Sequence, residues 1–291
     1  MTKDAAFYEL QFRNRPAVPD HPRILARWAS ESEKARRELR CFLDVPYGAH
    51  PMQKLDIYAA RGECRAVLMF IHGGYWRGMD KNEHGFVASA LADQGVTVVT
   101  PNYALCPEVS IAEIVRQIQG ASAWLYRHGD GFGVPPDRLY VAGHSAGGHL
   151  AAMMMATSWP QVGPDLPAKL FQGGLAISGL YDLREMINVA SINCDLKLDI
   201  ESATAVSPIF MQAATDAPLY LAVGSDELPP FQRQHADFGR HWENVLAESA
   251  RCDGENHYSI LLQLIDKKSE LRGLMQRMMR PWPAPHGLVR K

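Results

Sequence analysis

An α/β fold with a largely parallel central sheet is predicted by three observations on this 291-residue sequence. Short apolar runs alternate with longer stretches of helical periodicity, as in βαβ units. A Gly-His-Ser-Ala-Gly pentapeptide, residues 143–147, joins one apolar run to one helical stretch. The composition, with 47% hydrophobic and 21% charged residues, is ordinary for a globular protein. Because no repeat and no linker divides the chain, we expect a single α/β domain.

The apolar runs and the helical stretches alternate along the middle of the chain. Five runs bounded by Gly, Pro or polar residues are predicted to be buried strands: 66–72, 96–101, 139–144, 174–178 and 219–224. Four stretches with apolar residues at helical spacing are predicted to be helices: 81–94, 111–128, 149–157 and 231–247. Two earlier runs, 41–45 and 54–58, are separated by a turn-like Pro-Tyr-Gly and suit an antiparallel pair at one edge.

The two ends of the chain differ from this pattern. Residues 1–40 are polar and helical over 21–40, so we expect either a cap over the functional site or a flank beside the sheet. Residues 41–280 are expected to form the α/β domain. Residues 281–291 are rich in proline, which favours an irregular tail. A hydrophobic helix around 271–279 is expected to pack on the sheet, with a homodimer contact as the alternative.

Net charge and cysteine usage exclude several classes of function. The formal net charge is -2, so neither nucleic acid nor an anionic membrane is an expected partner. The five cysteines are widely spaced and form no Cys-x-x-Cys pair, which argues against a disulfide framework and a structural zinc site. The N-terminus lacks the apolar core of a signal peptide, and no apolar run approaches the length of a membrane span. We expect a cytoplasmic enzyme with a small-molecule substrate, no metal and no organic cofactor.

The pentapeptide at 143–147 places Ser145 between the predicted strand 139–144 and a helical stretch. A Gly-x-Ser-x-Gly in this setting is a nucleophile elbow, a sharp turn that pushes the serine hydroxyl out over the end of a sheet. Gly143 and Gly147 matter because a Cβ at either position would crowd the neighbouring strand and helix. Ser145 is therefore the predicted nucleophile.

Two later residues are predicted to complete a catalytic triad. A serine hydroxyl needs a base to remove its proton and a third group to orient that base. After a nucleophile elbow, the chain order of the partners is Asp or Glu, then His. Asp226, two residues beyond a predicted strand, is the predicted acid, with Glu227 as the alternative. Asp182 follows an earlier strand and is expected to cap the next helix. His257, in a loop near the end of the domain, is the predicted base.

A loop rich in glycine is predicted to supply the oxyanion hole. Acyl transfer requires N–H donors that meet the oxyanion as it forms. The sequence His-Gly-Gly-Tyr-Trp at 72–76 follows a predicted strand, and its two glycines let the backbone approach a substrate closely. The predicted donors are the backbone N–H groups of Gly73, Gly74 and Ala146. His72 is expected to support this loop through hydrogen bonds.

These motifs resemble those of the kynurenine formamidases, within the hormone-sensitive-lipase-like α/β-hydrolases. The shared motifs include His-Gly-Gly-Tyr-Trp at 72–76 and Gly-His-Ser-Ala-Gly-x-His-Leu-Ala at 143–151. The block 101–108 is similar to Tyr-Arg-Leu-Ala-Pro-Glu, although Ala104 replaces the arginine and a cysteine replaces the alanine. The resemblance covers about residues 55–264 and implies an α/β-hydrolase fold.

The resemblance also implies a reaction, the hydrolysis of N-formyl-L-kynurenine to kynurenine and formate in tryptophan catabolism. The predicted Ser145 would form an acyl-enzyme. Tyr75 and Trp76 are expected to wall a small acyl pocket and stack on the aryl ring, or else to pack as ordinary aromatic residues of a rim loop. His144 and His149 flank the predicted nucleophile and are expected to support the elbow or line the substrate pocket.

Two other functions remain open at this stage. A carboxylesterase for short acyl esters would use the same triad, so fold and triad cannot separate it from an arylformamidase. A non-catalytic ligand receptor or scaffold is less compatible, because such proteins typically lose a triad member. Four charged residues are candidates for holding the substrate's amino-acid group, and the sequence does not choose among them: Arg77, Asp80, Lys81 and Glu83.

Overall fold

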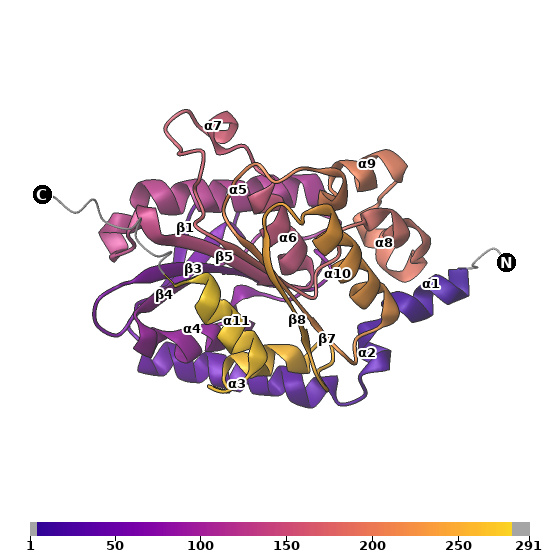
Figure 1. Ribbon diagram of the computed structural model, residues 1–291, viewed down its shortest axis with the longest axis horizontal. Coiled ribbons are helices and arrows are strands. Elements are labelled where there is room, and N and C mark those ends of the chain that lie inside the picture. The colour runs from indigo at the N-terminus through magenta and orange to yellow at the C-terminus, as the bar shows by residue number, and fades with distance from the viewer. Residues whose placement is uncertain (1–4, 281–291) are drawn as a thin grey trace, which may run out of the picture.

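The computed structural model describes residues 5–280, which contain a single eight-stranded sheet lying between two layers of helices (Figure 1). The strands are β1 Cys41–Pro46, β2 Lys54–Tyr58, β3 Ala66–Ile71, β4 Val96–Pro101, β5 Leu139–His144, β6 Gly174–Ile177, β7 Leu219–Gly224 and β8 Leu246–Cys252. Their order across the sheet is β1-β2-β4-β3-β5-β6-β7-β8. The pairs β1–β2 and β2–β4 are antiparallel and all later pairs are parallel. The predicted α/β-hydrolase fold and the predicted antiparallel edge pair are therefore confirmed.

The central strands are apolar because both of their faces are covered. Every residue of β3, β4 and β5 is buried, whereas every residue of the edge strand β1 is at least partly exposed. Parallel strands buried on both faces are expected to be continuous hydrophobic runs. The adjacent positions of β3 and β5 bring their carboxyl ends together, so the loops that follow them meet at one edge of the sheet.

Six helices make up the two layers within the described residues. On one face lie α3 His21–Glu38, α4 Phe86–Leu91 and α11 Glu270–Met278. On the other lie α5 Ile111–His128, α6 Ala146–Met155 and α10 Pro229–His241 (Figure 1). Each layer forms its own apolar core with the sheet, one including Trp28 and Phe70 and the other including Leu150 and Phe238. Burial of this surface is the main source of stability.

Short helices gather around the edge of the sheet. They are α1 Ala5–Phe12, α2 Asn14–Ala17, α7 Trp159–Val162, α8 Ala190–Leu196 and α9 Ile200–Ala205. Short 3-10 segments are η1 Lys81–Glu83, η2 Ala92–Gln94, η3 Gly129–Phe132, η4 Pro136–Arg138, η5 Leu183–Asn188, η6 Pro208–Phe210 and η7 Ser259–Leu264. Helix α1 lies against α8 at the right of Figure 1, although the two helices are far apart in the sequence. The N-terminal segment is thus brought to the same edge as the loops that follow the strands.

Several predicted helix boundaries are wrong. The expected helix 81–94 is interrupted and consists of η1, α4 and η2. The expected helix 231–247 ends at His241, because the chain then turns so that Leu246 can pair with Leu219 of β7. The apolar stretch that follows His257 is the 3-10 segment η7 Ser259–Leu264.

The C-terminal helix packs on the sheet, as expected. Leu271, Leu274, Met275 and Met278 of α11 are all buried in the core that also contains α3 and α4. The predicted irregular tail, 281–291, lies outside the described residues. No helix between residues 5 and 280 combines the length and the apolar character required to cross a bilayer.

Candidate active site

Ser145 lies in a strained turn at the carboxyl end of β5. Its φ of 58° and ψ of -120° are rare for a residue with a side chain. The turn is closed so tightly that a Cβ on Gly143 would come within 2.1 Å of the Gly147 carbonyl oxygen. A Cβ on Gly147 would come within 2.0 Å of the Ile71 carbonyl oxygen. The two glycines are therefore required for the reason that the sequence indicated, and the predicted elbow is present.

A chain of hydrogen bonds connects Ser145 to a buried carboxylate. The Nε2 atom of His257 lies 3.0 Å from Oγ of Ser145, and its Nδ1 atom lies 2.6 Å from Oε2 of Glu227. All three side chains are buried. Such a serine–imidazole–carboxylate arrangement can take the hydroxyl proton when the serine attacks and return it to a leaving group.

The carboxylate in this chain belongs to Glu227, so the prediction of Asp226 is wrong and its alternative is correct. Asp226 is exposed and accepts a hydrogen bond from the Ser225 hydroxyl. The Asp226 N–H bonds to the carbonyl of Glu255, which directs the next side chain back beneath the strand ends. The longer glutamate side chain then reaches His257 from one residue further along the loop.

Glu227 is held by two donors besides His257. The Gly224 backbone N–H donates to its Oε1 atom at 2.8 Å, and the Ser178 hydroxyl donates to the same oxygen. Ser178 is buried at the end of β6 with a φ of 52°, an uncommon conformation for serine. These hydrogen bonds fix the orientation of the buried carboxylate toward the imidazole.

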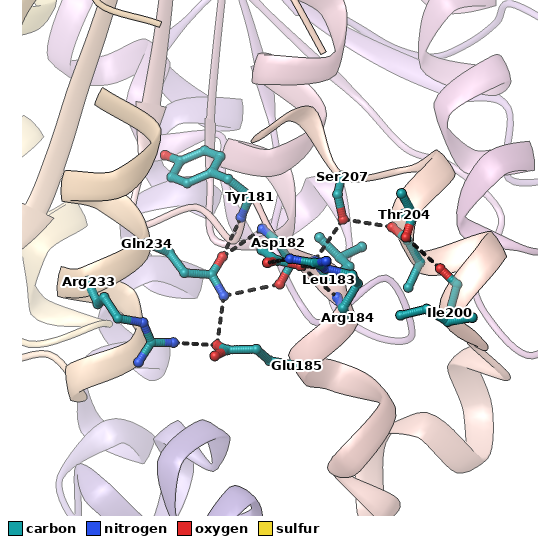
Figure 2. A network of polar contacts seen from close by, with 11 residues as sticks. Tyr181, Asp182, Leu183, Arg184, Glu185, Ile200, Thr204, Ser207, Arg233 and Gln234 are labelled. Atoms are coloured by element: carbon teal, nitrogen blue, oxygen red, sulfur yellow. Dashed lines mark hydrogen bonds and ion pairs between the residues drawn. The ribbon is translucent and has the colours of Figure 1, made fainter. Parts of the chain in front are cut away.

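The loop after Ser178 is anchored to α10 by the network in Figure 2. The Gln234 side chain accepts from the backbone N–H groups of Tyr181 and Asp182 and donates to the Glu185 carboxylate. Glu185 also pairs with Arg233 at 2.5 Å. Asp182 accepts from the backbone of η5, which is the capping role expected from the sequence. The network therefore holds the loop that follows Ser178 against α10, the helix that follows Glu227.

The loop after β3 approaches the nucleophile closely. A Cβ on Gly73 would lie 3.0 Å from Cβ of Ser145, so only glycine allows this distance. Gly74 has a φ of 108°, a conformation that side chains rarely adopt. Within residues 5–280, no protein acceptor receives the backbone N–H groups of Gly73, Gly74 or Ala146. These three groups are the donors predicted for the oxyanion hole, and they remain available to an incoming acceptor.

His72 supports this loop rather than facing the cavity. Its Nδ1 atom lies 2.8 Å from the Gly73 carbonyl oxygen, and its ring stacks on Tyr103 with centroids 4.2 Å apart. The Tyr103 hydroxyl donates to the His72 carbonyl at 2.9 Å. Burial lowers the pKa of His72, so the ring is neutral at pH 7.

Two of the four residues predicted for the substrate pocket lie in the core instead. Trp76 is completely buried and donates its indole N–H to Nδ1 of His149 at 3.2 Å. The other ring nitrogen of His149 donates to the carbonyl of Val206 at 2.7 Å. Burial lowers the pKa of His149 to about 4, so this ring is neutral. Of the two aromatic residues predicted for the pocket, it is Tyr75 that lines the cavity.

His144 lines the cavity and is hydrogen-bonded to the backbone of His257. Its Nε2 atom donates to the carbonyl of His257 at 2.8 Å, and the two rings lie 4.8 Å apart. Burial holds the pKa of His144 well below its ordinary value. His144 is therefore a neutral residue that supports the loop of His257. Support and lining of the pocket were the two roles expected for it.

A cavity of about 460 Å³ opens above Ser145 and His257. This volume is within the range of small-molecule sites. Its walls come from three parts of the chain: the N-terminal residues 12–16, the loop 74–79, and helix α8. Leu25 and Trp28 of α3 complete one side. The N-terminal segment thus forms part of the cover over the cavity.

Hydrogen bonds attach the N-terminal segment to both other walls. The Tyr75 hydroxyl donates to the Phe12 carbonyl at 2.5 Å and accepts from the Asn14 amide at 3.3 Å. The Glu9 carboxylate accepts from the backbone N–H and the hydroxyl of Ser191 at 2.7 and 2.6 Å. Sequence reasoning did not find these wall residues, because no local motif shows where a polar N-terminal segment will dock.

Metal ligands are not gathered at this site or elsewhere in the part of the chain that the structure describes. No group of three or more His, Cys, Asp or Glu side chains there is arranged to hold a metal ion. The buried histidines instead bond to backbone carbonyls, a tryptophan or the triad partners.

Comparison with known proteins identifies the family. The kynurenine formamidase of Danio rerio is 32% identical to this chain, over 86% of each sequence. The kynurenine formamidase of Salmo salar is 31% identical, over 85% of each. The chain belongs to the kynurenine formamidase family. It is a hydrolase, since the relatives it matches are kynurenine formamidases and esterases.

Other comparisons agree with the α/β-hydrolase fold of the chain. The BD-FAE family model matches residues 55–173. A solved structure from Silicibacter sp. TM1040, provisionally described as a thioesterase, has a TM-score of 0.82 and 31% identity, with 95% of this chain and 99% of that one covered. Esterase B of Lactobacillus rhamnosis has a TM-score of 0.68 at 17% identity, with 90% and 96% covered, and shows the shared fold.

Proposed function

We propose that this protein hydrolyses N-formyl-L-kynurenine to kynurenine and formate. The observation that carries the proposal is the chain Ser145–His257–Glu227 at the base of a cavity, in a member of the kynurenine formamidase family. A Ser-His-Glu arrangement is suited to acyl transfer, and a formamide is an acyl donor.

In the first half of the reaction, Ser145 attacks the formyl carbon. His257 Nε2 takes the hydroxyl proton, and the Glu227 carboxylate stabilises the imidazolium that forms. The oxyanion that develops on the formyl oxygen is met by the backbone N–H groups of Gly73, Gly74 and Ala146. When the tetrahedral intermediate collapses, the C–N bond breaks and His257 gives its proton to the departing aniline nitrogen.

In the second half, water replaces the amine. His257 takes a proton from the water as it attacks the formyl-enzyme ester, and the same N–H groups stabilise the new oxyanion. The C–O bond to Ser145 then breaks, the serine regains its proton from His257, and formate leaves. Each cycle consumes one water and restores the resting enzyme.

The chemistry of the substrate suits this site. An amide usually resists esterases because an alkylamine is a poor leaving group, but an aryl ring withdraws the lone pair of the nitrogen. The formyl carbon carries a hydrogen atom where other acyl groups carry a carbon chain, so attack on it is unhindered. The Tyr75 ring on the cavity wall is available to stack on the aryl ring.

The test is the specificity constant kcat/KM for N-formyl-L-kynurenine, measured beside p-nitrophenyl acetate and butyrate. We expect formylkynurenine to be preferred by orders of magnitude, with Ser145→Ala inactive on all three substrates. Turnover of the esters alone would overturn the proposed substrate and leave a short-acyl carboxylesterase with the same triad. Activity that survives in Ser145→Ala would overturn the triad itself.

A further inference from the structure

Three arginines lie around the cavity above Ser145, with one carboxylate among the lining residues. The arginines are Arg13, Arg15 and Arg77, and the carboxylate is Asp195 of α8. An excess of guanidinium groups at the mouth of a site attracts and orients an anionic group. The positions of these guanidinium groups therefore indicate which part of a substrate the site recognises.

Arg77 is already occupied by protein groups. Its guanidinium pairs with the Asp195 carboxylate at 2.5 Å and donates to the Ser191 carbonyl at 2.8 Å. The other charged candidates from the sequence are likewise engaged or buried. The Lys81 ammonium is buried between Asp44 and Asp56, at 3.1 and 2.7 Å.

The two remaining candidates do not face the cavity. The Asp80 carboxylate accepts from the Asn102 amide at 2.7 Å, and the Glu83 side chain belongs to η1. Neither residue lines the cavity above Ser145. Of the four charged residues considered in the sequence, only Arg77 reaches the cavity, and its charge is matched by Asp195.

Arg13 and Arg15, by contrast, form no ion pair with a carboxylate anywhere in residues 5–280. Both are exposed, while the neighbouring Phe12 and Asn14 are buried. Those two buried residues are bonded to the Tyr75 hydroxyl, which fixes the segment on the cavity wall. The alternation of buried and exposed residues places the two arginines at the rim of the cavity.

The surroundings of the two arginines differ. Arg13 is near the Glu9 carboxylate, whose pKa is lowered chiefly by hydrogen bonds from Ser191 and to a smaller extent by Arg13. Arg15 is near the Tyr258 hydroxyl, whose pKa burial raises and Arg15 partly lowers, and it also acts on the Glu83 carboxylate, whose pKa burial raises and Arg15 slightly lowers. Tyr258 follows the catalytic histidine directly in the chain. Arg15 is thus the guanidinium on the His257 side of the cavity.

We infer that Arg15, assisted by Arg13, binds the carboxylate of the substrate's amino-acid group while the formyl group faces Ser145. This inference deepens the proposed function and rests on it for the identity of the substrate. A guanidinium can hold a carboxylate through two parallel hydrogen bonds, which fixes orientation as well as charge. The attached residues Phe12 and Asn14 hold Arg13 and Arg15 in place before the substrate arrives.

The experiment compares substrates that carry a carboxylate with analogues that lack it. One pair is N-formyl-L-kynurenine and 2-formamidoacetophenone, which lacks the amino-acid group. A second pair, 3-(2-acetoxyphenyl)propanoate and 2-ethylphenyl acetate, presents the carboxylate contrast as esters without an ammonium group. The readout is the ratio of kcat/KM for the member with a carboxylate to that for the member without one. Arg15→Gln is expected to lower this ratio by about tenfold, mainly through KM, and the double variant with Arg13→Gln by more.

The matched control is Arg23→Gln in α3. Arg23 has an 87% exposed side chain paired with Asp20 and does not line the cavity, so its removal is expected to leave the ratio unchanged. Arg15→Lys, which keeps the charge but loses the two-pronged contact, is expected to give an intermediate ratio.

Each outcome decides the inference. If Arg15→Gln lowers kcat/KM equally for both members of a pair, or leaves the ratio of the wild type, the assigned role is wrong. If the wild type hydrolyses neither formamide, the proposed function fails, and the ester pair still decides whether Arg15 selects an anionic group. A circular dichroism spectrum of each variant separates loss of binding from loss of fold.

Discussion

At the scale of single residues, the reactivity of Ser145 depends on which carboxylate holds the His257 imidazole. The negative charge must lie against Nδ1 for the ring to keep the tautomer whose Nε2 faces the serine. Glu227 meets this requirement at 2.6 Å, and the exposed Asp226 does not. Two adjacent acidic residues therefore have different roles, and they can be separated by mutation.

Glu227→Gln is expected to lower kcat by about 10³- to 10⁴-fold, because an amide keeps the shape of the side chain but cannot stabilise the imidazolium. Asp226→Asn is the matched control and is expected to change kcat by less than about twofold, since exposed substitutions away from a site usually have small effects. Steady-state kinetics of both variants with one ester substrate would check this. A reversed order would restore Asp226 as the acid.

The Ser178 hydroxyl is expected to matter because it donates to the same carboxylate. Ser178→Gly removes that donor and tolerates the φ of 52° better than alanine would. We expect kcat to fall by about tenfold with little change in KM, as one charge-assisted hydrogen bond is lost. An unaltered kcat would show that the other donors to Glu227 are sufficient.

The residues of the site differ in how well a sequence can reveal them. Ser145 and Gly73 belong to local motifs whose glycines are required by the backbone, so the pattern itself contains the geometry. Glu227 could not be separated from Asp226, because the choice depends on how the loop after Gly224 turns. Trp76 was expected at the pocket, but its indole points into the core toward α6.

At the scale of elements, the elbow joins β5 to α6 with almost no space around it. Gly147 lies against the carbonyl of Ile71 at the end of β3, so strand, turn and helix are packed at the backbone level. Gly120, in the middle of α5, has no atom within 4 Å of a built Cβ. The two glycines offer a direct comparison of a required glycine with a dispensable one.

Gly147→Ala is expected to destabilise the fold by about 3 kcal/mol or more, since the overlapping atom is backbone and cannot rotate away. Gly120→Ala is expected to stabilise it by about 0.5–1 kcal/mol, as alanine has less conformational entropy to lose in a helix. Urea unfolding of both variants would measure these changes. Equal tolerance of alanine at the two positions would contradict the close packing of the elbow.

The alternation of elements could be predicted better than their ends. The predicted bounds of α5 match the structure, because Ser110 caps its first turn and its apolar stripe is regular. The end of α10 could not be predicted, since the residues after His241 are compatible with a helix and turn away only to let β8 pair with β7. Local periodicity does not contain that constraint.

At the scale of the whole molecule, the buried histidines make stability depend on pH. Burial lowers the pKa of His84 to about 3 and that of His149 to about 4, and also lowers those of His72 and His144. Below about pH 6.5 the unfolded chain takes up protons that the folded chain does not. The free energy of unfolding must therefore fall as the pH decreases from 6.5 toward those lower values.

For His84 and His149 together, the expected loss between pH 7.0 and 5.0 is about 4 kcal/mol, because each ring contributes up to about 1.4 kcal/mol per pH unit once the unfolded chain is protonated. Urea unfolding at pH 7.0 and 5.0, at one ionic strength, would measure it. His84→Phe, which stacks among Trp28, Phe70 and Phe86, is expected to reduce this pH dependence. Equal stability at both pH values would contradict the assigned neutral, buried states.

The N-terminal residues that cover the cavity are attached to the rest of the fold in a different way from Ser145, Glu227 and His257. Ser145, Glu227 and His257 lie in the loops that follow the sheet strands β5, β7 and β8 and are bonded to one another. Residues 12–16 are instead attached by a few hydrogen bonds to Tyr75 and, through Glu9, to Ser191. Exchange of that short segment would alter which molecules are admitted while the bond-breaking machinery stayed intact, so new substrate ranges could arise in this family without a new catalytic centre.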